Sequence, residues 1–156
     1  MTSGVVQDGE FTHWGVPINS QEDIDAVLAM KTWAVVGLGN NPERAAYGVS
    51  KLLQDKGHHI IPVYPRAETV HGETGYKTLA EIPIAVDVVD CFVNSKLVGT
   101  VVDEAIAIGA QSIWIQLGLV DEESAERAIA AGLDVAMDLC IKVEYERLAG
   151  SISPQE

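Results

Sequence analysis

The sequence predicts an α/β fold, a doubly wound parallel sheet of about five strands with helices on both faces. Three observations carry this prediction. Short apolar segments recur along the chain, they alternate with segments of helical periodicity, and glycine or proline separates many of them. Strands that are apolar along their whole length are typical of parallel sheets buried on both faces. Right-handed crossovers through the helices then give the doubly wound arrangement.

A short helix is expected before the first strand. Ser20 stands three places before Asp23, a spacing that resembles a capping box. Ile24, Val27 and Leu28 then fall on one helical face. The chain should therefore enter the sheet from a helix.

The remaining elements alternate between strand and helix. Apolar segments predict strands at residues 32–37, 58–65, 85–94, 112–118 and 133–138. Helical periodicity predicts helices at residues 42–57, 97–109 and 121–132. Residues 66–83 are polar and are expected to form a connection with one helical turn near Leu79.

Length and composition indicate a single domain. The chain has 156 residues, of which 47% are hydrophobic, which suffices for one buried core. We expect this domain to span residues 19–150, after a flexible arm at 1–18 and before a tail at 151–156. The apolar runs are far shorter than the roughly 18 residues that a membrane span needs.

The net charge of the chain limits the classes of molecule that it is expected to bind. Lysine and arginine total 10 against 23 aspartate and glutamate residues, a net charge of -13. Such a surface disfavours nucleic acids and anionic membranes, although local donors can still bind a small anion. The first residues lack the basic and apolar regions of a secretory signal, so we expect a cytoplasmic protein. There Cys91 and Cys140 should stay reduced, and no zinc-like spacing predicts a metal site.

A glycine-containing loop follows the first predicted strand. Parallel strands present their carboxyl ends at one edge of the sheet, where ligands of such folds bind. Residues 37–41 read Gly-Leu-Gly-Asn-Asn, but Pro42 stands where a dinucleotide fingerprint has its third glycine. Asn41 is expected to cap the next helix, with Pro42 as its first residue, so that the free N–H groups favour an anion. An ordinary turn without a ligand explains two glycines equally well.

The second predicted strand ends in Val-Tyr-Pro-Arg, residues 63–66. Cofactors with an unphosphorylated ribose usually find a carboxylate at this place, whereas Arg66 favours a phosphate on the ribose. Glu68, two residues further on, could still supply the carboxylate that binds an unphosphorylated ribose. A phosphorylated ribose with a pyrophosphate describes either coenzyme A (CoA) or NADP.

Several motifs taken in order resemble one family. They are "AVVGLGNNPERAAYGVSKLLQDKGHHIIPVYP", "GYKTLAEIP", "VDVVDCFVNS", "EAIAIGAQSIWIQLG", "AAGLDVAMDLC" and "KVEYERL". Together they resemble the small stand-alone CoA-binding proteins, which are similar to the nucleotide-binding domain of the succinyl-CoA synthetase α subunit. The resemblance runs from about residue 20 to residue 148. It implies a Rossmann-like domain of five strands that holds CoA at the carboxyl edge of its sheet.

The resemblance also assigns candidate contacts. It places the loop 37–41 at the pyrophosphate, Arg66 at the phosphorylated ribose, and residues 92–95 on the adenine side. The full set of candidate ligand contacts is Gly37, Leu38, Gly39, Asn40, Asn41, Arg44, Pro65, Arg66, Phe92, Val93, Asn94, Ser95, Gln116 and Gly118. Relatives commonly have serine or threonine at Gly39, a basic residue near Val93 and Asn94, and Asp-Arg-Cys at residues 138–140. Each departure removes a hydrogen-bond donor or a positive charge.

No catalytic group can be assembled from the sequence. Trp114 is expected in the core, and Cys140 is expected to be a small buried hydrophobe rather than a reactive thiol. The leading hypothesis is therefore non-catalytic binding of CoA or an acyl-CoA, a small nucleotide ligand. Two alternatives stay open: an NADP(H)-binding enzyme or redox sensor, and a protein-interaction domain with a degenerate nucleotide site.

Overall fold

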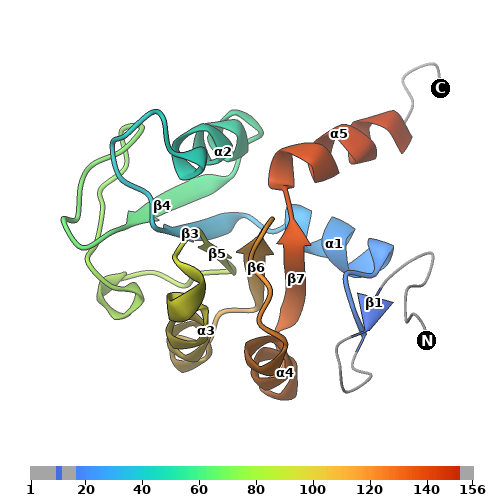
Figure 1. Ribbon diagram of the computed structural model, residues 1–156. Helices are drawn as coiled ribbons and strands as arrows, with labels where there is room; N and C mark the ends of the chain where they lie inside the picture. Colours follow the sequence, from blue (N-terminus) through green and yellow to red (C-terminus); the bar gives the residue numbers. More distant parts are fainter. Residues whose placement is uncertain (1–9, 12–16, 152–156) are drawn as a thin grey trace.

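The computed structural model describes residues 10–11 and 17–151, and its centre is a parallel sheet (Figure 1). The sheet of the described chain has five strands in the order β4-β3-β5-β6-β7. Their bounds are Thr32–Val36 for β3, His59–Val63 for β4, Val88–Cys91 for β5, Ser112–Gln116 for β6 and Asp134–Leu139 for β7. All four neighbouring pairs are parallel. The predicted Rossmann-like α/β fold is confirmed.

Helices cover both faces of this sheet (Figure 1). One face carries α1 (Gln21–Leu28), α2 (Ala45–Asp55) and α5 (Ile141–Ser151). The other carries α3 (Val98–Ala107) and α4 (Glu122–Ala130). Two single turns of 3-10 helix, η1 (Leu79–Glu81) and η2 (Ser95–Leu97), lie in the connections. The predicted turn near Leu79 is therefore present.

The two faces have different cores. Under α3 and α4 the buried side chains are almost all aliphatic. Under α1, α2 and α5 two large rings, Trp33 and Trp114, lie fully buried with their centroids 6.0 Å apart. Each indole N–H donates to a backbone carbonyl, of Met30 and Leu139 respectively, so burial leaves neither donor unpaired. Trp114 is a core residue, as predicted.

Helix α1 begins as the sequence indicates. The Ser20 hydroxyl accepts a hydrogen bond from the Asp23 N–H at 3.1 Å, which caps the helix. Just before it, Asn19 adopts a φ of 59° and exchanges two hydrogen bonds with the backbone of Met137 in β7. This amide pairs with an edge strand and fixes the chain where it enters the domain.

The expected N-terminal arm needs one correction. Within residues 1–18, the described parts are β1 (Glu10–Phe11) and β2 (Pro17–Ile18), which pair as antiparallel strands. Ile18 is only 5% exposed and belongs to the core under α3 and α4. The domain therefore includes residue 18, while residues 1–9, 12–16 and 152–156 lie outside the described residues.

Helix α5 has no counterpart among the predicted elements. Tyr145 anchors it, because its hydroxyl hydrogen-bonds His58 and also donates to the Leu28 carbonyl oxygen. Arg147 adds an ion pair with Asp25 of α1 at 2.9 Å. These contacts join segments far apart in the sequence, and local periodicity does not reveal them. No helix in the described part of the chain is long and apolar enough to cross a membrane.

The strand order reverses between β3 and β5. From β3 the chain crosses to β4 at one edge, whereas β5, β6 and β7 follow on the other side. Gly37 directly follows β3, has a φ of 101°, and lies against the residue after β5. A Cβ atom at Gly37 would stand 1.9 Å from the carbonyl oxygen of Phe92. Only glycine allows the backbones to approach this closely at the point where ligands of such sheets bind.

The substitution Gly37→Ala should lower the free energy of unfolding by about 3 kcal/mol or more, because a methyl group there combines a backbone clash with conformational strain. The control is Gly57→Ala, since Gly57 has a similar φ of 99° but no atom within 4 Å of the added carbon. That variant should lose only about 1–2 kcal/mol. Urea unfolding monitored by tryptophan fluorescence measures both changes, and equal losses would contradict the proposed close approach.

Candidate functional site

Three adjoining cavities of the described chain open at the carboxyl edge of the sheet, and Gly37 and Arg44 line all of them. The loop cavity, about 420 Å³, lies between the loop after β3 and the loop after β4. The helix cavity, about 560 Å³, lies between α2 and the end of β6. The strand cavity, about 400 Å³, lies between the ends of β4 and β5 and helix α3. The three together form a continuous site around the switch point.

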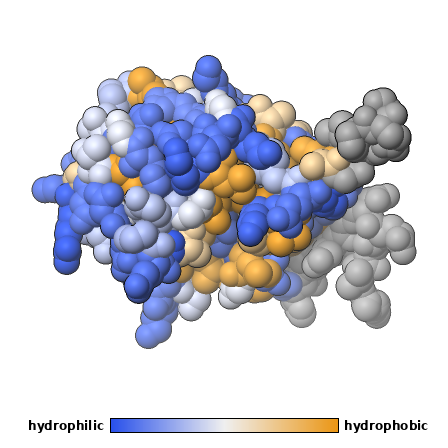
Figure 2. Space-filling model, turned by 90° about the horizontal axis from the view of Figure 1, so that it is seen from above, coloured by the Kyte–Doolittle hydropathy of each residue, from blue (hydrophilic) through white to orange (hydrophobic). Residues whose placement is uncertain are grey.

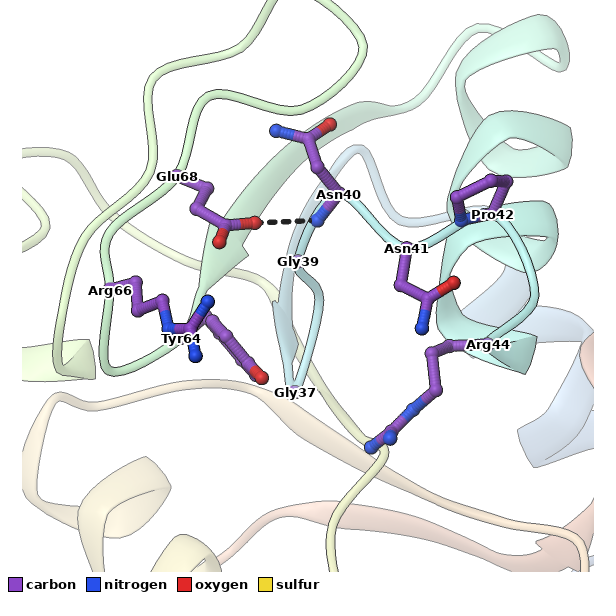
Figure 3. A pocket seen from close by; sticks show the side chains of 9 residues that line it. All are labelled: Gly37, Gly39, Asn40, Asn41, Pro42, Arg44, Tyr64, Arg66 and Glu68. Atoms are coloured by element: carbon purple, nitrogen blue, oxygen red, sulfur yellow. Dashed lines mark hydrogen bonds between the residues drawn. The ribbon is translucent and has the colours of Figure 1, made fainter.

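The loop cavity is closed on one side by Glu68 (Figure 3). Its Oε1 accepts a hydrogen bond of 2.6 Å from the backbone N–H of Asn40, and the Asn40 side chain donates to the Thr69 carbonyl oxygen. Gly39 makes room for this carboxylate, because a Cβ atom there would lie 3.0 Å from Glu68 Oε1. Glu68, a candidate ligand of a ribose on sequence grounds, thus hydrogen-bonds to the glycine loop instead.

The beginning of α2 differs from the prediction. Asn41 does not cap the helix, and Pro42 is not its first residue, since α2 begins at Ala45. Instead, Asn41 Oδ1 accepts from the N–H of Glu43 at 3.0 Å within a local turn. A short polar side chain can accept a hydrogen bond from a backbone N–H in a turn or at a helix end, and here Asn41 accepts one in a turn.

As a consequence, the amino end of α2 keeps free donors. Arg44 occupies the N-cap position and makes no capping bond with its side chain. The N–H groups of Ala45 and Ala46 have no acceptor among the described residues, and both residues line the helix cavity. Such donors, together with the helix dipole, favour an anion.

Cations gather around these donors although the chain is acidic overall. Arg44, Arg66 and Lys77 line the cavities, three of the 10 lysine and arginine residues in the chain. Within the described residues, none of the three side chains forms an ion pair. Figure 3 shows Arg44 and Arg66 on opposite sides of the glycine loop. A chain of net charge -13 therefore keeps unpaired positive charge at this edge.

The helix cavity has a buried polar pair in its wall. Gln116 is 6% exposed, lines the cavity, and donates from Nε2 to Asp90 Oδ1 at 2.6 Å. Asp90 is fully buried, and its Oδ2 has no partner among the described residues. Burial raises the pKa of Asp90 to about 8, against the smaller opposing effect of the Gln116 hydrogen bond. The carboxyl group is thus largely neutral at neutral pH.

The two cysteines differ. Cys91 is fully buried, and burial followed by the charge of Asp90 raises the pKa of its thiol to about 12. Cys140 was expected to be buried, but it is half-buried and lines the helix cavity just before α5. A position at the turn from an edge strand into a helix leaves the side chain facing this opening.

The strand cavity has flat apolar walls, and the charged residues Lys77 and Glu104 also line it. Tyr64 and Pro65 form one side, Phe92 and Val93 lie on another, and Leu97 is at the margin. Proline and aromatic side chains present flat faces suited to stacking against a ring. A planar aromatic group fits this part of the site.

Most candidate residues from the sequence meet in these cavities. Those that line at least one of them are Gly37, Gly39, Asn40, Asn41, Arg44, Pro65, Arg66, Phe92, Val93, Asn94 and Gln116. Leu38, Ser95 and Gly118 line none of the three. Leu38 is fully buried in the core, Ser95 is exposed at the start of η2, and the Gly118 N–H donates to Asp138 at 2.8 Å.

Sequence reasoning missed several residues that line the cavities, among them Lys77 and Leu117, and it missed Asp90 in the wall behind Gln116. Tyr64 and the small residues Ala45 and Ala46 have ordinary local patterns, so only the tertiary structure places them here. The sequence does indicate that Asp90 is unusual, because it is an acidic residue inside a strand predicted to be buried. A lone buried carboxyl group commonly marks a functional site.

The fold and the cavities define an α/β domain with a candidate ligand site at a topological switch point. The chain belongs to the family described as the CoA binding domain, whose model matches residues 31–146. The protein YneT of Bacillus subtilis is 39% identical over 127 residues, which cover 81% of this chain and 94% of YneT. A hypothetical protein from Pyrococcus horikoshii has a solved structure with a TM-score of 0.78 and 38% identity, covering 83% of this chain and 92% of that one.

A larger enzyme subunit shares part of the sequence. The ADP-forming acetate–CoA ligase II subunit alpha of Pyrococcus furiosus is 35% identical over 83 residues. The matched region is 53% of this chain but only 18% of the ligase subunit. The similarity therefore concerns one domain of that subunit.

Asp90 should make the stability of the protein depend on pH. Between pH 3.8 and about 8 the folded protein holds a proton on this carboxyl group that the unfolded chain has released. The stability it contributes is complete below that window and falls as the pH rises, by at most about 1.4 kcal/mol per pH unit. In Asp90→Asn this decline should be absent. Urea unfolding of both proteins from pH 4 to 8 tests this, and parallel curves would contradict it.

Proposed function

We propose that this protein binds coenzyme A, or a thioester of it, without transforming it. The single observation that carries the proposal is the junction at Gly37 and Arg44. There, cations without ion pairs and free helix N–H groups adjoin all three cavities of the described chain. A ligand with a central diphosphate, a phosphorylated nucleoside on one side and a long arm on the other matches this arrangement.

The diphosphate is assigned to the junction. Arg44 reaches all three cavities, and the N–H groups of Ala45 and Ala46 stand free beside it. Glu68 already occupies the Asn40 N–H of the glycine loop, and we assign the phosphates to the α2 donors beside Arg44. Gly37 lines all three cavities at this point, because its lack of a side chain lets it lie directly against the backbone of Phe92.

The nucleoside is assigned to the loop and strand cavities. Arg66 lines the loop cavity without an ion pair in the described part of the chain, so its charge is available to the phosphate on the ribose. Tyr64 and Pro65 border the strand cavity, and Phe92 and Val93 close it from the β5 side. The adenine ring stacks between these faces.

The relatives support the same ligand class. The family description names CoA, and the similar domain of the Pyrococcus furiosus subunit belongs to an enzyme named for acetate and CoA. What that ligase does as a whole extends beyond the shared region, since most of the subunit has no match here. Ligand binding, rather than the ligase reaction, is the property proposed for this chain.

The cavity lining supports binding without chemistry. Histidine and serine are missing from the residues that line the three cavities in the described structure. Glu68 is engaged with the loop, and Cys140 has no neighbouring base among the residues of the helix cavity. Glu104 lines the strand cavity, where its carboxylate makes no hydrogen bond with another lining side chain among the described residues. General acid–base or nucleophilic catalysis needs a paired group within hydrogen-bond reach, and no hydrogen-bonded pair of this kind joins the described residues that line the cavities.

Arg66→Glu tests the assignment of the ribose phosphate. Loss of the cation and introduction of an anion should weaken CoA binding by about 2 kcal/mol or more, and dephospho-CoA binding by clearly less. The control is Lys31→Glu, which makes the same charge change at an exposed residue before β3, at the opposite edge of the sheet. Its effect should be small and equal for both ligands.

Calorimetric titration at one fixed salt concentration measures these affinities, with NADP and NAD titrated alongside. Equal losses for CoA and dephospho-CoA would remove the role assigned to Arg66. Saturable NADP binding in the absence of CoA binding would instead support the nicotinamide-cofactor alternative.

A further inference from the structure

The helix cavity exceeds what a nucleotide alone requires. It is the largest of the three adjoining cavities, about 560 Å³, and it lies on the far side of Arg44 from the loop cavity. Its walls come from α2, from the segment after β5, from the end of β6 and from Cys140. Neither the ribose phosphate nor the adenine ring is assigned to it, so it is available to the rest of the ligand.

The chemistry of this cavity suits an uncharged aliphatic chain. Val49, Phe92, Leu117 and Leu119 line it together with small residues, and Arg44 at the junction is its one charged lining residue. A terminal carboxylate inside it would find no second cation in the lining. The surrounding protein has a net charge of -13, which adds repulsion.

Gln116 supplies one oriented polar group in this apolar setting. Its Nε2 is held by Asp90, while its Oε1 makes no hydrogen bond among the described residues. Because the buried Asp90 fixes the amide, Gln116 presents an acceptor and its second N–H in a defined direction. The amide and thioester groups of an acylated pantetheine arm have the complementary donors and acceptors.

Leu117 leaves apolar surface uncovered at the opening. It is 64% exposed although it lines the helix cavity. Figure 2 shows hydrophobic residues reaching the surface between hydrophilic areas on the side of α2 and α5. An aliphatic ligand group that covers this leucine gains binding free energy in proportion to the area buried.

We infer that the protein recognises short, uncharged aliphatic acyl thioesters of CoA in preference to free CoA, with the acyl group lying against Leu117 in the helix cavity and Gln116 orienting the thioester arm. This inference rests on the proposed function. It adds the substrate class, namely acyl groups that end in methyl rather than in carboxylate.

Calorimetric titration with CoA, acetyl-CoA, butyryl-CoA, hexanoyl-CoA and succinyl-CoA tests it. Affinity should rise roughly threefold with each added methylene until the cavity is filled. Succinyl-CoA has the same chain length as butyryl-CoA but carries a carboxylate, so it should bind at least tenfold more weakly than butyryl-CoA.

The variant Leu117→Ser should flatten the dependence on chain length. The matched control is Val120→Ser, because Val120 is similarly exposed at 58% in the same loop but lines none of the three cavities. That variant should keep the wild-type dependence. Both positions are exposed, so neither change should disturb folding.

Two failures are distinguishable. If CoA binds but all thioesters bind equally well, or if Val120→Ser flattens the dependence as much as Leu117→Ser, the acyl preference is wrong while CoA binding stands. If neither CoA nor any thioester binds, the proposed function itself is wrong.

Discussion

The contact between the backbones of Gly37 and Phe92 is the constraint on which the site depends. The two segments that leave β3 and β5 must diverge at the switch point, yet the N–H of Phe92 still donates to Val36 and that of Gly37 to Val63. A side chain at residue 37 would force them apart, because no space exists for a Cβ atom. The absence of that atom lets three cavities meet at one point, where Arg44 reaches each of them.

Positive side chains gather at the carboxyl edge of the sheet, although the whole chain has a net charge of -13. Arginine and lysine side chains elsewhere, such as Arg127 and Arg147, are used in ion pairs that join helices. Arg44, Arg66 and Lys77 are not, within the described residues. The glycine loop, by contrast, has one of its donors neutralised by Glu68. The anion site that we propose therefore lies at the free amino end of α2, beside the loop to which the sequence motif points.

The Asp90–Gln116 pair links the core to the site. A carboxyl group inside a parallel sheet is unfavourable unless it is neutral or hydrogen-bonded, and here it accepts one bond while its other oxygen has no partner among the described residues. Burial keeps the pKa high enough for the neutral form. The carboxyl group of Asp90 lowers the stability of the fold because one of its oxygens has no hydrogen-bond partner among the described residues. Its other oxygen fixes the orientation of the Gln116 amide in the wall of the helix cavity.

The sequence by itself determined the five strands, their parallel arrangement, the loop after β3 and the position of Arg66 after β4, because apolar runs and helical periodicity are local properties of the chain. The order of the strands in the sheet came only from the tertiary structure. The sequence also indicated the cap at Ser20 and the turn at Leu79. Only the tertiary structure decided where α2 begins, that Glu68 binds Asn40, that Gln116 meets Asp90, and that α5 packs on α1 and α2. Each of these features depends on which residues distant in sequence come into contact when the chain packs. A polar side chain such as that of Asn41 can hydrogen-bond in more than one local conformation, and the packed chain determines which of these bonds forms.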